Sequence, residues 1–306
     1  MSPRPARWPV PLSRAGFQFL LAAVVAGISL LVIPGSAAAQ EPPYFVAYSH
    51  AMEEPGNLEF TMRNTAASPR FGNPFGSATI EMEFGTTAWW TTEFYLSGQA
   101  TGNDSAIFNG FRIENRFRPL LNEHWVNPVL YVEYENVNEA DRSILEVVGH
   151  DSVQDLTVPN RIQRSETERS LEAKLILSSN FRGWNISENF IAEKALNEGE
   201  PAEFGYALGI SRPFVLAASP RACTFCRENF TGALEMYGGL GTTDSFGWRG
   251  TSQYIGPVIA YSIPRGPTIA FSPNVGLNDN SLGVLYRFSV SYEVQQIFSH
   301  LHGVGR

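Results

Sequence analysis

Polar and apolar residues alternate with a period of two along most of the chain between residues 57 and 298. The clearest stretch is 76–99, where two alternating runs of about ten residues each meet at Thr86-Thr87. A period of two predicts β-strands, and the two-residue break between the runs predicts a hairpin. A run of about ten residues also has the length of a strand that crosses a bilayer at a tilt.

Repeats of this hairpin account for the rest of the chain. Twelve runs fit the pattern, at about 57–66, 76–85, 88–99, 106–117, 125–137, 168–180, 184–196, 202–213, 230–240, 253–263, 267–277 and 282–298. Their links are mostly tight turns at one end, while the other end holds the longest link, Asn138–Thr167, which is long enough to enter a lumen or cover its mouth. The predicted fold is all-β, a closed antiparallel up-and-down transmembrane β-barrel of about 12 strands with a short N-terminal segment.

The two faces of the predicted strands differ in charge. One face is apolar, as with Ile80, Met82 and Phe84 or Leu171, Leu175 and Leu177. The opposite face carries eleven glutamates and four basic residues, namely Glu81, Glu83, Glu93, Arg112, Glu114, Arg116, Glu133, Glu135, Glu172, Lys174, Glu193, Glu203, Glu235, Arg287 and Glu293. A soluble barrel would show the same period. A transmembrane barrel would accommodate both faces, with the apolar face against the lipid and the charged face against water in the lumen.

Two further features bear on this assignment. Trp89, Trp125 and Trp184 each follow a link at the tight-turn end, where an aromatic girdle would place them at the membrane boundary. Glu188 breaks the pattern because it shares a face with Ile186 and Phe190. We expect either an interfacial position or a β-bulge there.

The chain begins with a predicted secretory signal, residues 1–39. Three arginines precede an apolar run over Phe17–Ile33, and Ala37-Ala38-Ala39 forms a small-residue cleavage site. Without the signal, the chain has 19 basic and 30 acidic residues. The resulting net charge of −11 argues against nucleic acid as a partner. The predicted parts that follow are an N-terminal tail or plug segment (40–56) with a possible short strand at Tyr44–Tyr48, the barrel (57–298) and a C-terminal tail (299–306).

The last strand, SLGVLYRFSVSYEVQQIF, has alternating aromatic residues and ends at Phe298. It resembles the C-terminal signature of bacterial outer-membrane β-barrel proteins. The stretches FGTTAWWTTEFYL, LYVEYENVN and IGPVIAYSIPRGPTIAFSP resemble small porin-like barrels of the same group. This resemblance implies the barrel fold, a place in the outer-membrane lipid, and the barrel assembly machinery as a partner of the last strand.

Cys223 and Cys226 are the two cysteines of the chain. No histidine or third cysteine lies nearby to complete a zinc site, and Arg227 stands where haem attachment needs histidine. In an oxidising compartment we expect a disulfide that pins the 214–229 segment. We expect no cofactor and no metal.

The charged face is the candidate functional site. Arg112, Glu114 and Arg116 alternate on one strand, between strands that offer Glu93 and Glu133 with Glu135. One interpretation is a lumen that selects solutes, and the other is an ion-pair network that fills a narrow barrel. The acidic excess favours a cation-preferring path for small solutes. The expected path residues are Glu81, Glu83, Glu93, Arg112, Glu114, Arg116, Glu133, Glu135, Glu172, Lys174, Arg287 and Glu293.

Two alternatives remain open, an outer-membrane enzyme acting on lipid or peptide and a soluble secreted β-barrel that binds a ligand. None of the five histidines, His50, His124, His150, His300 and His302, falls in a predicted strand beside a serine or carboxylate. We therefore expect no catalytic residues. A metal site at His150, Asp151 and Asp155 is a weaker hypothesis still.

Overall fold

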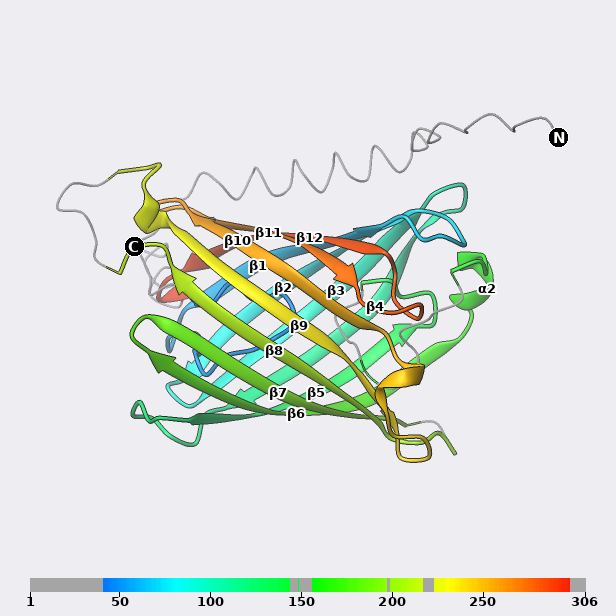
Figure 1. The fold of residues 1–306 in the computed structure, drawn as a ribbon, viewed down its shortest axis with the longest axis horizontal. Coiled ribbons are helices and arrows are strands. Elements are labelled where there is room, and N and C mark those ends of the chain that lie inside the picture. Colours follow the sequence, from blue (N-terminus) through cyan, green and yellow to red (C-terminus); the bar gives the residue numbers. More distant parts are fainter. Residues whose placement is uncertain (1–40, 144–147, 149–155, 197–198, 217–222, 298–306) are drawn as a thin grey trace, which may run out of the picture.

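The computed structural model describes residues 41–143, 148, 156–196, 199–216 and 223–297. Its twelve antiparallel strands close into a single barrel in which each strand pairs with its neighbours in sequence and β1 pairs with β12 (Figure 1). The predicted fold class is confirmed. The strands are β1 (Leu58–Ala67), β2 (Phe75–Thr87), β3 (Trp90–Thr101), β4 (Ala106–Phe117), β5 (Asn127–Asn138), β6 (Thr167–Phe181), β7 (Trp184–Ala195), β8 (Glu203–Pro213), β9 (Phe230–Thr242), β10 (Gln253–Ser262), β11 (Thr268–Gly276) and β12 (Val284–Val294).

Two ends of the barrel are distinguished below. The N-terminal end is where β1 begins and carries the links β2–β3, β4–β5, β6–β7, β8–β9 and β10–β11. The loop end carries the long β5–β6 link, which contains the short helix α2 (Asn160–Gln163). Two 3₁₀ turns, η2 (Arg227–Asn229) and η3 (Trp248–Gly250), precede β9 and β10. Among the described residues no helix is long and apolar enough to cross a membrane.

The first hairpin turns at Ala88-Trp89, so the prediction of Thr86-Thr87 was wrong by two residues. β2 continues to Thr87, which pairs with Trp90, after a register shift beyond Gly85. This shift leaves Thr86 as an extra residue on β2 and so moves the turn along the chain. The N-terminal segment bonds beside it, since the Gly85 carbonyl accepts from the Gly56 backbone and the Gly85 amide donates to the Asn57 carbonyl. A Cβ at Gly85 would lie 2.1 Å from the Glu54 carbonyl oxygen, so only glycine lets β2 and the N-terminal segment approach this closely.

Two other strand predictions need correction. The last strand ends at Val294, because Gln295 and Gln296 turn and the Gln296 amide donates to the side chain of Asn57. Phe298 lies outside the described residues. Tyr44–Tyr48 forms no strand, since its backbone amides bond to side chains of the barrel wall rather than to another strand.

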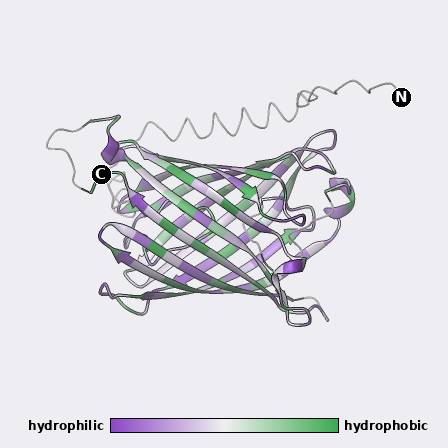
Figure 2. Ribbon diagram, in the orientation of Figure 1, coloured by the Kyte–Doolittle hydropathy of each residue, from purple (hydrophilic) through white to green (hydrophobic). Residues whose placement is uncertain are grey.

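Figure 2 shows hydrophilic and hydrophobic residues alternating along the strands. The exposures of the side chains place the apolar residues outside the barrel and the charged residues inside. On β6, Leu175 is 41% exposed while its neighbour Ile176 is fully buried. Trp89, Trp125 and Trp184 are exposed at the N-terminal end, as expected for a girdle. Glu188 is on the outward face in regular register with Leu177 and Leu208, so the alternative of a bulge is wrong. This distribution is that of a barrel surrounded by lipid.

Candidate functional site: a charged and plugged lumen

Nine glutamates form a continuous row inside the barrel. Each lies directly opposite the next on the neighbouring strand, across nine consecutive strands. From β12 through β1 to β8 this glutamate ladder is Glu293, Glu59, Glu83, Glu93, Glu114, Glu133, Glu172, Glu193 and Glu203. It begins at the N-terminal end, where Glu293 is the second-last residue of β12, and ends at the loop end, where Glu203 opens β8.

The ladder climbs the barrel because the strands are tilted. With strands about 4.8 Å apart and tilted by about 40°, each step rises about 3 Å along the axis, so the eight steps cover about 25 Å. That is the height of the apolar band of a typical outer-membrane barrel. The carboxylates therefore mark a line through the whole lumen, from one mouth to the other.

This row is costly for the fold. Like charges directly opposite each other on neighbouring strands are destabilising, whereas alternating charges stabilise. Three basic side chains offset part of the cost. Arg116 binds Glu83, Glu93 and Glu114, Lys174 lies 2.7 Å from Glu172, and Arg112 lies 3.9 Å from Glu133. The structure thus brings the arginines of β4 together with the glutamates that were predicted to lie beside them on β3 and β5. Arg112 also lies 2.5 Å from Glu135 and 2.8 Å from Asp141.

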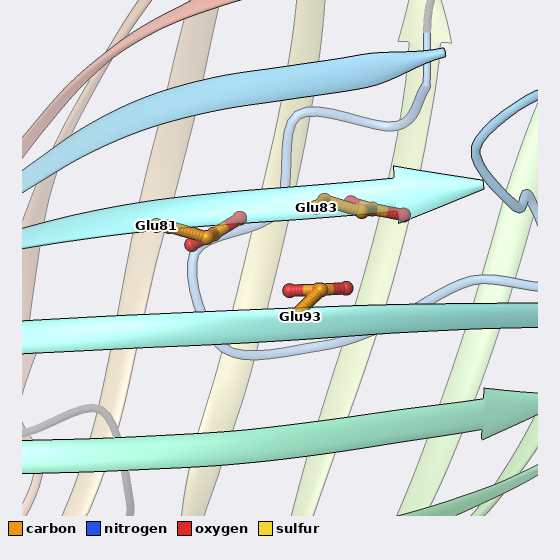
Figure 3. A group of neighbouring side chains, drawn as sticks. All are labelled: Glu81, Glu83 and Glu93. Carbon is orange, nitrogen blue, oxygen red and sulfur yellow. The ribbon is translucent and has the colours of Figure 1, made fainter. Parts of the chain in front are cut away.

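Glu81, Glu83 and Glu93 form the tightest carboxylate group. Figure 3 shows the first two along β2 and the third facing them from β3, with one oxygen of each within 4.8 Å of the others. Arginines account for this proximity, since Arg63 binds Glu81 at 2.5 Å and Arg116 bridges the other two. A metal ion would have to displace these guanidinium groups.

The N-terminal segment, residues 41–57, lies inside the barrel and crosses the ladder at Tyr48. The Tyr48 hydroxyl donates to Glu114 over 3.1 Å. Its ring packs edge-on against Tyr131 and lies beneath Arg116 and Lys174, whose cationic groups are 5.3 and 4.9 Å from the ring centre. An aromatic ring between cations gains from cation–π attraction, so Tyr48 is held at the point where the ladder reaches mid-barrel.

A second contact fixes the segment to the opposite wall. Glu235 of β9 accepts hydrogen bonds from three successive backbone amides, those of Phe45, Val46 and Ala47, each at 2.9 Å. On β7, the Asn189 side chain accepts from the Tyr48 amide and donates to the Tyr48 carbonyl. A carboxylate that accepts three amides is a strong, charge-assisted acceptor.

The segment closes the lumen at mid-height. Glu114, Glu133 and Glu172 are at most 3% exposed there, and the small cavity between Tyr48 and the wall residues Tyr131 and Lys174 is about 20 Å³, roughly the space of one water molecule. Toward the N-terminal end the lumen opens into a cavity of about 920 Å³, called the vestibule below. Acidic residues of the wall and of the segment line it, among them Glu41, Glu53, Glu54, Glu59 and Glu293.

Burial, together with nearby charges, shifts the pKa values of two titrating groups of the segment. Burial, reinforced by Glu293 and Glu41, raises the pKa of Glu53 to about 8. Burial lowers the pKa of His50, an effect that the neighbouring Glu123 partly offsets. His50 is bonded to Glu123 and Asn180, both at the N-terminal end.

The β5–β6 link enters the mouth of the barrel at the loop end. Asp141, Arg142 and Ser143 are buried in the mouth, and Arg142 lies over the ring of Phe75 at 5.7 Å. From the same link the side chain of Asn160 in α2 donates to Thr101. The expectation that this link enters or covers the lumen therefore holds for its described residues. The predicted metal ligands His150, Asp151 and Asp155 lie outside them.

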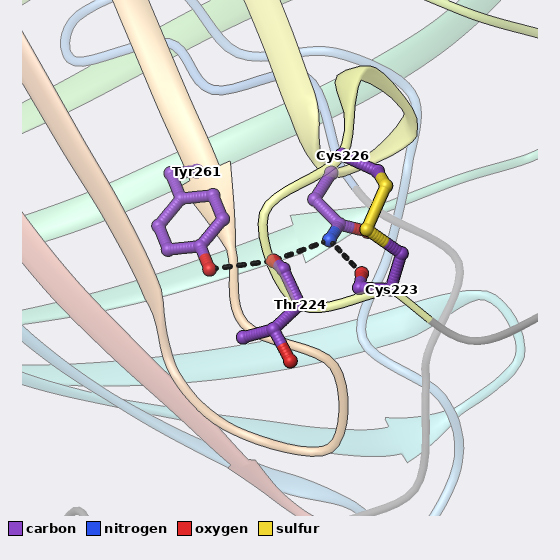
Figure 4. Close-up of a disulfide and its surroundings, with 5 residues drawn as sticks. Cys223, Thr224, Cys226 and Tyr261 are labelled. Carbon is purple, nitrogen blue, oxygen red and sulfur yellow. Dashed lines mark hydrogen bonds between the residues drawn. A yellow bond between two sulfur atoms is a disulfide. The ribbon is translucent and has the colours of Figure 1, made fainter.

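Cys223 and Cys226 form the expected disulfide at the N-terminal end. Figure 4 shows the four-residue turn that it closes before β9, tied to β10 by a hydrogen bond from the Tyr261 hydroxyl to the Thr224 carbonyl (2.7 Å). Phe225, between the two cysteines, is 77% exposed and packs edge-on against Phe230 and Tyr261. The disulfide lies outside the lumen and takes no part in the charged site.

The remaining predicted path residues are also placed by the structure. Arg287 is buried inside and donates to Tyr237, and Glu235, on the predicted charged face, holds the N-terminal segment. Sequence reasoning missed Glu59 and Arg63, although the alternation of Leu58, Phe60 and Met62 on β1 would have shown their inward direction. It also missed the lumenal role of Tyr48, for which the sequence gives no local signal.

No family model and no curated protein matches the sequence. Among solved structures, the chain is similar to the COG4313 outer membrane channel from Pseudomonas putida F1, with a TM-score of 0.48, 10% identity, and coverage of 83% of this chain and 99% of that one. It is also similar to the KdgM porin in complex with disordered oligogalacturonate (TM-score 0.45, 7% identity, coverage 77% and 98%). A third similar structure is LpxR from Salmonella typhimurium (TM-score 0.38, 12% identity, coverage 76% and 99%).

Proposed function

We propose that this protein is a bacterial outer-membrane β-barrel that passes or binds small solutes passively, and that the glutamate ladder makes its lumen select cations. The ladder is the observation that carries the proposal. Nine glutamates directly opposite one another on neighbouring strands cost stability, and residues of alternating charge would fill the lumen more stably. A row of carboxylates from mouth to mouth, between low-dielectric walls, concentrates a negative potential along the path.

The proposal also includes an orientation in the membrane and a set of partners. The loop end faces the outside and the vestibule faces the periplasm, as longer outer loops and shorter periplasmic turns require. The partners are outer-membrane lipid on the apolar face, the barrel assembly machinery at the last strand, and small solutes in the lumen, with no nucleic acid. Residues 1–39 are the cleaved secretory signal, so mature protein purified from membranes would begin at Gln40.

No catalytic role is part of this proposal. His50, the described histidine that lies inside the barrel, is bonded to a carboxylate and an amide rather than to a hydroxyl nucleophile. A hydrolase would need a nucleophile, a base and an orienting group within hydrogen-bond reach. Activity of purified protein on lipid or peptide substrates would favour the enzyme alternative.

Recording in planar bilayers tests the function. The refolded mature protein is inserted between chambers that hold a tenfold gradient of potassium chloride. The current through open channels should reverse at a potential shifted from zero toward the equilibrium potential of potassium, because the carboxylates admit cations and repel chloride. Open channels that prefer chloride would reject the proposed selectivity.

A further inference from the structure

The N-terminal segment and the wall are joined by interactions of two different kinds. At its C-terminal end the segment continues into β1 and is joined to the barrel backbone, since Gly56 donates to Gly85 and accepts from Ile297. From Tyr44 to Tyr48 it is held mainly by side chains, namely Glu235, Asn189 and Asn185. Water can replace each of these side-chain partners, whereas the backbone bonds near Gly56 belong to the barrel itself.

The space around the segment lets it leave in one direction. Residues 41–54 line the vestibule, and the segment enters the lumen from the N-terminal end. A swing about residues 55–57 would move Tyr48 out through the vestibule without unpairing any of the twelve strands. This movement would break the hydrogen bonds to Glu235 and Asn189. It would also separate the Tyr48 ring from the two cations and the tyrosine that surround it on the wall.

Tyr48 also packs, together with Met52, against apolar residues of the wall. Val129, Tyr131 and Ile176 form a small buried cluster against which Tyr48 and Met52 pack. Ile176 is fully buried although it lies on the lumenal face. Its exposure would therefore report directly whether the segment is in place.

We propose that residues 44–52 are a removable plug that closes the cation path at Tyr48 and is latched by Glu235. The path itself rests on the function proposed above, but docking of the plug does not. Glu235 is suited to the latch because a single carboxylate holds three consecutive amides, so loss of its charge weakens three bonds at once. When the plug leaves, the rest of the ladder, from Glu114 to Glu203, becomes continuous with the ladder glutamates that already line the vestibule.

The test uses the full-length mature protein with Ile176→Cys as a reporter. The native cysteines are joined in a disulfide, so a small charged thiosulfonate reagent reacts at position 176 alone. In the reporter background the reagent should react slowly. Adding Glu235→Gln should speed the reaction about tenfold or more, since a hydrogen bond to a charged group is worth at least that factor in an equilibrium. Tyr48→Ala should act in the same direction.

Glu193→Gln is the matched control, because it removes one lumenal carboxylate from the ladder near the loop end and should leave the labelling rate unchanged. The same variants are then recorded in planar bilayers, where Glu235→Gln should raise the open probability. Equal labelling rates with and without Glu235→Gln and Tyr48→Ala would overturn the plug and show that the segment is a fixed part of the wall. Faster labelling without conductance, or with chloride preference, would keep the plug and reject the cation path.

Discussion

The hydroxyl of Tyr48 donates to Glu114 over 3.1 Å and so joins the N-terminal segment to the glutamate ladder. The same carboxylate oxygen accepts from Tyr95 at 2.5 Å, while its partner oxygen lies 3.1 Å from Arg116. Glu114 is fully buried. One ladder carboxylate is thus shared by the wall, the segment and the cation that neutralises it, which makes this position sensitive to the loss of any partner.

Replacing Arg116 by Met should strongly destabilise the barrel. The substitution leaves Glu83, Glu93 and Glu114 without their shared guanidinium group in a buried site. Removal of one partner of a buried ion pair costs about 3–5 kcal/mol. Urea unfolding in lipid vesicles measures the loss. Arg118→Met is the control, because its pair with the half-exposed Glu123 should be worth about 1 kcal/mol or less. Equal effects would contradict the role of Arg116.

Replacing Glu133 and Glu172 by Gln should weaken cation selectivity in the conducting protein. These neighbours lie at mid-barrel, and each Gln keeps the shape of the side chain while removing its charge. The reversal potential in a salt gradient should shift toward that of chloride, and Lys174→Met should shift it the opposite way. Glu188→Gln, on the lipid-facing surface, should leave the potential unchanged. A shift of the same size from Glu188→Gln would show that surface charge, not the ladder, sets selectivity.

Leu175→Arg should destabilise the inserted barrel by about 2–4 kcal/mol, the penalty for a charge near the middle of the lipid face. Leu121→Arg is the matched control. It makes the same change at an exposed position of the β4–β5 link and should cost about 0.5 kcal/mol or less. Refolding into vesicles measures both. Equal penalties would contradict the placement of β6 in the membrane. Ile176→Arg does not serve as a mild control, because Ile176 is buried beneath the plug.

Docking of the plug should weaken as the pH rises from about 4.5 to about 8. The pKa of Glu53 is raised to about 8 in the folded protein by burial, Glu293 and Glu41, so the folded state holds a proton that the undocked segment releases. Stability then falls with rising pH, by at most about 1.4 kcal/mol per pH unit for one group. Labelling of the Ile176→Cys reporter, corrected for thiolate formation, should speed up across this range. Glu53→Gln should remove that dependence, and the exposed Glu54→Gln should retain it.

Loss of the disulfide should leave insertion intact. Cys223 and Cys226 are separated by three positions and lie outside the lumen, so the bond closes a very short loop and restricts the unfolded chain by about 2 kcal/mol or less. Mass spectrometry without reduction should show the mature chain two hydrogens lighter than its reduced form. The double variant to serine should insert with the same yield. Free thiols in the mature protein, or failure of that variant to insert, would contradict this expectation.

The sequence by itself determined the strands and their faces. Successive side chains of a strand point to opposite sides, so each strand shows a period of two in its own sequence, whatever the other strands are. Ile80 and Met82 on one side and Glu81 and Glu83 on the other needed no further information. The disulfide followed in the same way, because its two cysteines are neighbours in the chain and had no alternative partner.

Only the tertiary structure decided what lies against what inside the barrel. Glu59 meets Glu293 because the sheet closes between β1 and β12, and no local pattern fixes the register of strands so far apart in sequence. The turn at Ala88-Trp89 was displaced by the register shift after Gly85, the residue at which β2 also bonds to the N-terminal segment. The latch joins Val46 to a carboxylate 189 positions away, and the irregular segment that makes it has no periodicity to read.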